Sequence, residues 1–134
     1  MIVIDASALA KLILKEQGWE SVMPYIHEGI ISIDQIAKEA TNAIGNRFKE
    51  AAISLGQSKL MFDALMKIVG SVVKLVSEMD YLEEASRIML QRDIAIYDAL
   101  YIALAKQMKL KLLTADQFQA KTAASENVET ILLE

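Results

Sequence analysis

The chain has 134 residues and a net charge of −4, so we expect a single domain over residues 1–134 that does not bind nucleic acid tightly by charge alone. It has no cysteine and one histidine, which excludes disulfides, thiol catalysis and zinc sites built from cysteine or several histidines. Hydrophobic residues form 54% of the sequence, which suggests that a partner covers part of the surface, yet no apolar run reaches the ~18 residues of a membrane span.

Strands and helices are expected to alternate along the chain. Ile2, Val3 and Ile4 form a continuous apolar run, which is typical of a strand covered on both faces. Further strands are expected at 30–33, 72–76, 110–113 and 128–133, and helices at 6–15, 19–27, 35–52, 58–70, 81–91, 97–109 and 115–123. This alternation predicts an α/β fold, a three-layer sandwich around a five-stranded, mainly parallel sheet with right-handed crossovers.

Two helix starts have recognisable capping residues. Asp34 is expected to cap the helix that begins at Gln35. Ser77 and Asp80 have the spacing of a capping box for the helix that begins at Tyr81. Both predictions concern segments that follow a strand directly.

Four acidic residues stand out by their position. Asp5 ends the first strand and Asp116 follows the fourth, so both carboxylates enter one crevice if these strands are neighbours. Asp98 lies near the start of the most apolar helix and shares a face with core residues, where an unpaired carboxylate costs several kcal/mol. Glu39 lies one to two turns into the long helix after the second strand, with Asn42 at position i+3.

Each acid also has a simpler explanation. Asp5, Asp98 and Asp116 all lie where a helix begins, and aspartate is a favoured helix cap. Glu39 alone is compatible with a solvated helix position. As a set, however, the four acids have no matching cluster of lysine or arginine. A hard divalent cation, Mg²⁺ or Mn²⁺, is the usual solution for crowded carboxylates.

Hydroxyl and ammonium groups accompany these acids. Ser7 and Thr114 each lie two residues from an acid of the set, although Thr114 with Gln117 also fits a capping box. Lys11 follows Ser7 by one turn and is a candidate cation for a substrate phosphate, or else extends to solvent. Trp19 and Tyr25 are expected either on a partner surface or in the core.

Together these segments resemble the PIN-domain ribonucleases, especially the VapC-type toxins of toxin–antitoxin pairs. The matching segments are Asp5-Ala-Ser7 with Lys11, Glu39 with Asn42, Tyr97-Asp98-Ala99 with Tyr101, and Thr114-Ala-Asp116. The resemblance covers essentially the whole chain and implies that Asp5, Glu39, Asp98 and Asp116 are metal-binding acids, with Ser7 or Thr114 as a hydroxyl neighbour.

The resemblance also implies an activity and partners. They are Mg²⁺- or Mn²⁺-dependent cleavage of single-stranded or structured RNA to a 5′-phosphate and a 3′-hydroxyl, a homodimer, and inhibition by a small antitoxin protein. The cytoplasmic location that we expect rests instead on the sequence, which has no membrane span and in which Asp5 interrupts any signal peptide. One rival is a receiver-type signalling module, which needs an aspartate after the third strand, where this chain has Ser77-Glu78-Met79. Another is a catalytically inactive, protein-binding PIN domain, which retention of all four acids disfavours.

Overall fold

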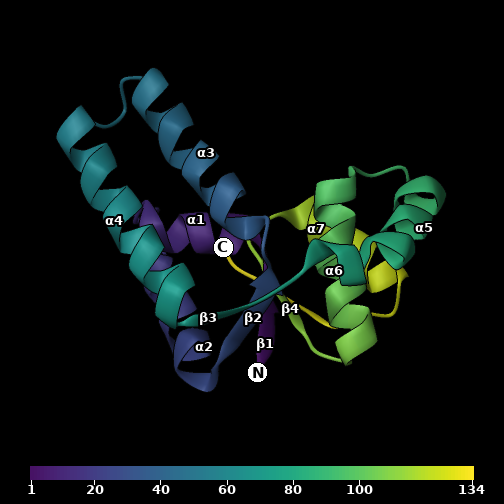
Figure 1. Ribbon diagram of the computed structural model, residues 1–134. Coiled ribbons are helices and arrows are strands. Elements are labelled where there is room, and N and C mark those ends of the chain that lie inside the picture. Colours follow the sequence, from purple (N-terminus) through teal and green to yellow (C-terminus); the bar gives the residue numbers. More distant parts are fainter.

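A five-stranded parallel sheet forms the centre of the molecule. The structure is a computed structural model that describes residues 1–134. The strands are β1 (Ile2–Ile4), β2 (Ile30–Ile33), β3 (Val73–Val76), β4 (Leu112–Thr114) and β5 (Thr130–Leu132). Their spatial order is β3-β2-β1-β4-β5, and every neighbouring pair is parallel (Figure 1). The predicted α/β fold with a parallel sheet is therefore confirmed, and the first strand is its central strand.

Helices lie on both sides of this sheet. They are α1 (Ala6–Ile13), α2 (Met23–Glu28), α3 (Ile36–Lys49), α4 (Leu55–Ser71), α5 (Leu82–Arg92), α6 (Ile96–Met108) and α7 (Gln117–Ser125), with 3₁₀ helices η1 (Trp19–Val22) and η2 (Glu78–Asp80). Helices α1, α3 and α4 pack together on one side, whereas α5 packs on α6 on the other (Figure 1). Helix α6 contacts β1, β2 and β4, so its apolar residues complete the core over the central strands.

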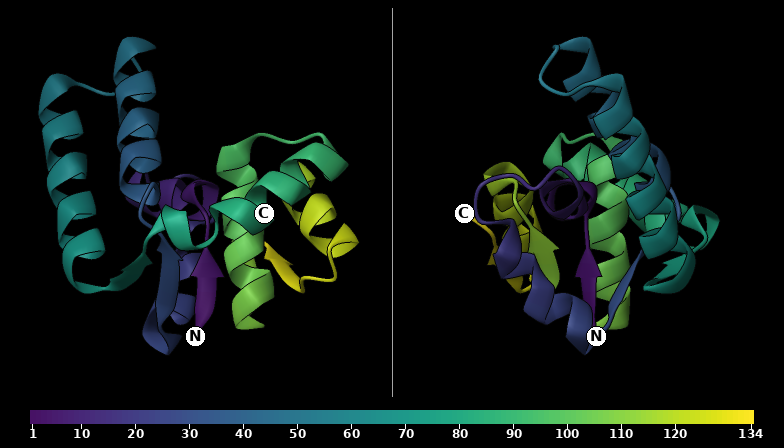
Figure 2. Two further views of the ribbon diagram at one scale, coloured as in Figure 1. Left: turned by 45° about the vertical axis from the view of Figure 1, so that its right-hand side comes forward. Right: turned by 90° about the vertical axis from the view of Figure 1, so that its left-hand side faces the viewer.

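Helices α3 and α4 form an antiparallel pair that extends beyond the rest of the molecule. Both views in Figure 2 show their connected ends standing clear of the sheet. Large apolar side chains are exposed along this pair: Phe48, Leu55, Leu60, Phe62 and Met66 are 40–71% exposed. These five are among the 16 large apolar residues that are exposed over the whole molecule. Trp19 and Tyr25 are half-buried against the core.

Two capping predictions are wrong, and tertiary contacts explain both. Asp34 does not cap α3, because its Oδ1 accepts a hydrogen bond from the backbone N–H of Glu78, 3.3 Å away. Ser77 caps the short helix η2 through the N–H of Met79, so α5 begins without a side-chain cap. A capping box does exist at α4, where Ser54 bonds the Gln57 N–H and the Gln57 side chain accepts from the Ser54 N–H.

The strand order tests the rival fold. A receiver module has the flavodoxin-like order 2-1-3-4-5, whereas this sheet has the order 3-2-1-4-5. The receiver interpretation is therefore wrong. None of the helices has the length and apolar character needed to cross a membrane.

One strand boundary matters for the site. The fourth strand was expected at 110–113 but spans Leu112–Thr114, because α6 ends at Lys109 in a left-handed conformation with φ of 55° and the chain needs two residues to reach the sheet. Thr114 is consequently a buried strand residue. The predicted capping box of Thr114 with Gln117 does not form, because Asp116 is the cap of α7.

Candidate active site

The candidate site lies where the strand order reverses. From β1 the sheet continues to β2 and β3 on one side and to β4 and β5 on the other, and such reversals are where open α/β sheets bind ligands. Asp5 follows β1 and Asp116 follows β4, so the two residues flank this point. The backbone N–H of Asp5 donates to the carbonyl oxygen of Leu113 at 3.2 Å, which fixes Asp5 beside β4.

Asp5 is held by three hydrogen bonds. Its Oδ1 accepts from the Ser7 hydroxyl at 2.7 Å and from the Ala8 N–H at 3.0 Å, so it caps α1. Its Oδ2 accepts from the Thr114 hydroxyl at 2.5 Å. The Ser7 hydroxyl also accepts from the Ala115 N–H at 2.9 Å, so the ends of β1 and β4 are linked by side chains. Ser7 and Thr114 thus position Asp5, and Asp5 itself is only 4% exposed.

Asp116 and Asp98 approach from the α6–α7 side. Asp116 is exposed and caps α7, with Oδ1 accepting from the N–H groups of Phe118 and Gln119. The Asp98 carboxylate is half-buried and has no hydrogen-bond partner in the protein, so it is not a helix cap. The Gln119 side-chain amide donates to the Asp98 carbonyl oxygen at 3.0 Å and holds α7 against the start of α6.

Glu39 reaches the site from α3. It is half-buried, and its Oε1 accepts from the hydroxyl of Tyr101, a fully buried residue of α6, at 2.9 Å. Gln35, at the start of α3, donates from Nε2 to the Tyr97 carbonyl oxygen at 2.7 Å. These two bonds hold α3 and α6 together directly behind the acids.

The four acids influence each other electrostatically. Burial raises the pKa of Asp5, the hydrogen bonds from Thr114, Ser7 and Ala8 lower it, and the charge of Asp116 raises it. Burial also raises the pKa of Glu39, the Tyr101 bond opposes this, and the charges of Asp98 and Asp5 add to it.

Asp98 follows the same pattern. Burial and the charge of Asp116 raise its pKa, so the four carboxylates form one repulsive group. No lysine or arginine forms a salt bridge with any of them. Both alternatives for Lys11, a contact with a substrate phosphate and extension to solvent, are wrong, because its side chain is buried and Nζ donates to the Gln17 carbonyl oxygen at 2.6 Å.

A cavity of about 690 Å³ opens beside two of these acids. Its lining consists of Gln35, Lys38, Glu39, Asn42, Glu78, Ala95, Tyr97 and Asp98. The cavity is therefore formed by the starts of α3 and α6 together with η2. Asn42, which the sequence placed next to Glu39, lies in its wall and is exposed.

The donor set fits a hard cation that retains much of its own water. All the candidate ligands are carboxylate oxygens, and their mutual repulsion is relieved by a positive ion. No group of three or more acidic, histidine or cysteine side chains is arranged to hold a metal ion. An ion held here would therefore be bound through one or two carboxylates and its own waters, which is the usual mode of Mg²⁺ binding.

Sequence reasoning did not assign several residues at this site. Lys38 precedes Glu39, and Glu78 belongs to the segment interpreted as a capping box. Gln35 and Tyr97 come together only in the folded chain, where the Gln35 side chain donates to the Tyr97 carbonyl oxygen. One feature of the sequence could have indicated Tyr97: it is an aromatic residue directly before Asp98, and it lies outside the apolar stripe of the helix.

The fold and the site define a doubly wound α/β domain with an acidic cluster at its switch point. The profile of the PIN domain matches residues 2–125, and the chain belongs to this family. Ribonuclease VapC3 of Pyrobaculum aerophilum is 27% identical over 118 residues, which cover 87% of this chain and 89% of that protein.

Solved structures support the same fold. The crystal structure of PAE2754 from Pyrobaculum aerophilum has a TM-score of 0.69 and 26% identity, covering 90% of this chain and 83% of that one. A toxin–antitoxin complex from Klebsiella pneumoniae has a TM-score of 0.62 and 14% identity, covering 90% of each chain. The latter resemblance concerns the fold alone.

Proposed function

We propose that the protein is a metal-dependent endoribonuclease that cleaves RNA phosphodiester bonds as the toxin of a toxin–antitoxin pair. The observation that carries this proposal is the meeting of four uncompensated carboxylates, from four distant segments, at the switch point of the sheet. Membership of the PIN family and the likeness to a protein named as a ribonuclease support it.

The acids are the groups that would hold Mg²⁺ or Mn²⁺. Bound there, the ion would supply an activated water for in-line attack and would stabilise charge on the leaving oxygen. The protein's own contribution is orientation: Ser7 and Thr114 fix both oxygens of Asp5, and Tyr101 fixes Glu39. Asp98, whose carboxylate makes no hydrogen bond within the protein, has both oxygens free for ligands.

Replacement of Asp98 by Asn tests the proposal. The substitution is nearly isosteric and breaks no hydrogen bond of the carboxylate, so the fold is kept while one charge is lost. RNA cleavage in Mg²⁺ should fall at least about 100-fold, the scale seen when one electrostatic stabiliser is removed from an active site. Cleavage of a labelled single-stranded RNA by the purified protein measures this.

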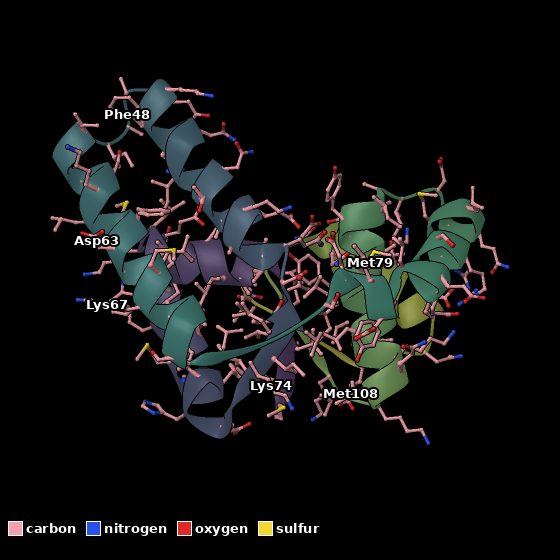
Figure 3. All side chains as sticks on the ribbon, in the orientation of Figure 1. Phe48, Asp63, Lys67, Lys74, Met79 and Met108 are labelled. Atoms are coloured by element: carbon pink, nitrogen blue, oxygen red, sulfur yellow. The ribbon has the colours of Figure 1, made fainter.

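Asp63→Asn is the matched control. Asp63 is an exposed aspartate on α4 (Figure 3) and is not among the residues that line the cavity. This variant should cleave at the parent rate. Equal rates for Asp98→Asn and the parent would show that the site is assigned wrongly, and a parent without activity would favour an inactive, protein-binding domain.

The proposal includes a small antitoxin protein and a homodimer as partners, in the cytoplasm. The exposed apolar side chains along α3 and α4 support a protein partner, because large exposed apolar patches mark interaction sites. Light scattering of the purified protein should report a dimer, and a short DNA-binding protein should be encoded beside it. A monomer at micromolar concentration with no such neighbour contradicts this part.

A further inference from the structure

We infer that the cavity beside Glu39 and Asp98 is a binding subsite for one unpaired nucleotide of single-stranded RNA, with Tyr97 stacking on the base and Lys38 binding a phosphate. The inference rests on the proposed function and deepens it by naming how the substrate is held. The cavity has a volume of about 690 Å³, which is within the range of cavities that bind small molecules.

Tyr97 is placed for contact with a ligand rather than for the core. Every residue of α6 from Ala99 to Ala105 is at most 3% exposed, but Tyr97, two residues before Ala99, is 59% exposed. Its side chain lies in the cavity wall together with Asp98. An exposed aromatic ring beside a phosphodiester-cleaving centre offers a stacking surface, and stacking requires a base that is free of a duplex.

Lys38 supplies the positive charge that the acids lack. It is exposed and forms no salt bridge, so its ammonium group is available to a ligand. Lys38 lines the main cavity and also an adjoining cavity of about 330 Å³ along α3. A phosphate at Lys38 would therefore lie between the acids and the surface of α3, along a path that a single strand can follow.

The two walls of this subsite are fixed relative to each other. Gln35 donates to the Tyr97 carbonyl oxygen at 2.7 Å, and Tyr101 donates to Glu39 at 2.9 Å, so α3 and α6 are clamped on either side of the cavity. Gln35 is 2% exposed, and its Oε1 is the one buried side-chain polar atom without a hydrogen-bond partner. An unpartnered buried acceptor costs stability, and the bond from Gln35 Nε2 to the Tyr97 carbonyl oxygen offsets part of this cost.

An abasic scan of the substrate tests the role of Tyr97. A short fluorescein-labelled RNA is made as a series in which each nucleotide in turn lacks its base, and KM and kcat are measured in Mn²⁺. Tyr97→Ala should raise KM about tenfold on the intact RNA, with kcat little changed, and Tyr97→Phe should behave as the parent.

The scan also gives a double-mutant cycle. At one position of the RNA, loss of the base should raise the KM of the parent about tenfold. The same loss should not raise the KM of Tyr97→Ala further, because the side chain that stacks on this base is already missing. Leu90→Ala is the control, since Leu90 is an exposed apolar residue on α5 that neither lines the cavity nor belongs to the apolar surface of α3 and α4. If no position depends on Tyr97, or if Leu90→Ala has the same effect, the stacking assignment is overturned.

The salt dependence of KM tests Lys38. A phosphate contact to a single strand contributes about 0.7 to the slope of log affinity against log salt, so Lys38→Ala should reduce this slope by about 0.7 at every sequence tested. Lys67→Ala, an exposed lysine on α4 (Figure 3), should leave it unchanged. An unchanged slope in Lys38→Ala overturns the phosphate assignment.

A binding measurement separates this inference from the proposed function. Fluorescence anisotropy with the same RNA series reports Kd, so Tyr97 and Lys38 are tested whether or not the parent cleaves. A parent that binds RNA through both residues but does not cleave would refute the nuclease proposal alone. A parent that cleaves with the same KM and Kd as Tyr97→Ala and Lys38→Ala would refute the subsite alone.

Discussion

Two charged clusters in this molecule are built in opposite ways. In the candidate site, four carboxylates lie near each other without a salt bridge to any cation. On α5–α7, Glu126 is 3% exposed and bonds three cations: Arg87 at 2.6 Å, Arg92 at 2.6 Å and Lys106 at 2.9 Å. The carboxylates of the site thus have no cationic partner, whereas Glu126 has three.

The pKa shifts follow this difference. Burial alone would raise the pKa of Glu126, but hydrogen bonds from Arg87, Lys106 and Arg92 lower it to about 2. In the site, burial and like charges raise the pKa of Asp5, Glu39 and Asp98. The buried carboxylate of Glu126 is thus fully paired with cations, whereas the carboxylates without a cation lie at the candidate site, where a ligand could pair with them.

Glu126→Gln is expected to have the largest effect on stability. The amide cannot balance three cations, and breaking a buried ion pair costs about 3 kcal/mol when the remaining charges are held in place. Because Arg87, Arg92 and Lys106 are each 34–39% exposed and can turn to solvent, we expect about 2 kcal/mol of lost unfolding free energy. Urea unfolding measures this loss.

Glu84→Gln is the control for that variant. Glu84 pairs with Arg87 in the same cluster but is 24% exposed, so its removal should cost less than that of Glu126. An equal or smaller loss for Glu126→Gln would show that the buried pairing of Glu126 stabilises the fold no more than a partly exposed pair does.

Asp5→Asn should have a smaller effect of opposite sign. In EDTA the variant should melt about 4 °C higher than the parent, because it removes about 1 kcal/mol of repulsion while the amide oxygen still accepts from Ser7 and Ala8. Mn²⁺ should stabilise the parent by mass action and the variant much less.

Asp5→Ala separates repulsion from capping in this experiment. It removes the charge and also the cap of α1, which is worth about 1 kcal/mol, so its melting temperature should lie below that of Asp5→Asn. If Asp5→Asn melts below the parent in EDTA and the parent is indifferent to Mn²⁺, the acids are structural.

Both clusters should contribute to the pH dependence of stability, and this effect should be smaller than those of Glu126→Gln and Asp5→Asn. An acid whose folded pKa is raised binds its proton more tightly in the folded state, so the site acids lower stability as pH rises above their ordinary values near 4. Glu126 acts in the other direction: its contribution is complete above about 4.5 and is lost as pH falls towards about 2. Thermal melts in EDTA should therefore pass through a maximum between these ranges.

Variants show which cluster causes the loss of stability on each side of that maximum. Asp5→Asn should reduce the fall in melting temperature towards neutral pH, and Mn²⁺ should abolish this fall in the parent. Glu126→Gln should flatten the decline towards acid. A single monotonic profile in EDTA would contradict the opposite character of the clusters.

The sequence predicted the parts of this structure that depend on local pattern. A continuous apolar strand and the rule for strand ends were sufficient to place Asp5 and Asp116 at one edge of the sheet. Helical periodicity placed Asp98 on the buried helix α6. These features depend on residues adjacent in the chain or one turn apart, which is why pattern alone reveals them.

Features that depend on contacts between elements could not be predicted. Lys11 fits a phosphate-binding position by spacing, but the loop at Gln17 folds back and takes its ammonium. Asp34 looks like a cap until η2 brings the Glu78 N–H to it. Tyr97 and Lys38 share a cavity only because side-chain hydrogen bonds bring the starts of α3 and α6 together, and no spacing rule relates residues 38 and 97.

The central place of β1 has a consequence for how the protein is made. β1 leaves the ribosome long before its second neighbour, β4, which consists of residues 112–114. Until that late segment emerges, Asp5 lacks the Thr114 hydroxyl and has no Asp116 beside it, and such long-range parallel pairings form slowly. A chain interrupted before Leu112 carries three of the four acids and half of the central pairing. During translation, the complete acidic site thus arises only after most of the chain has been synthesised.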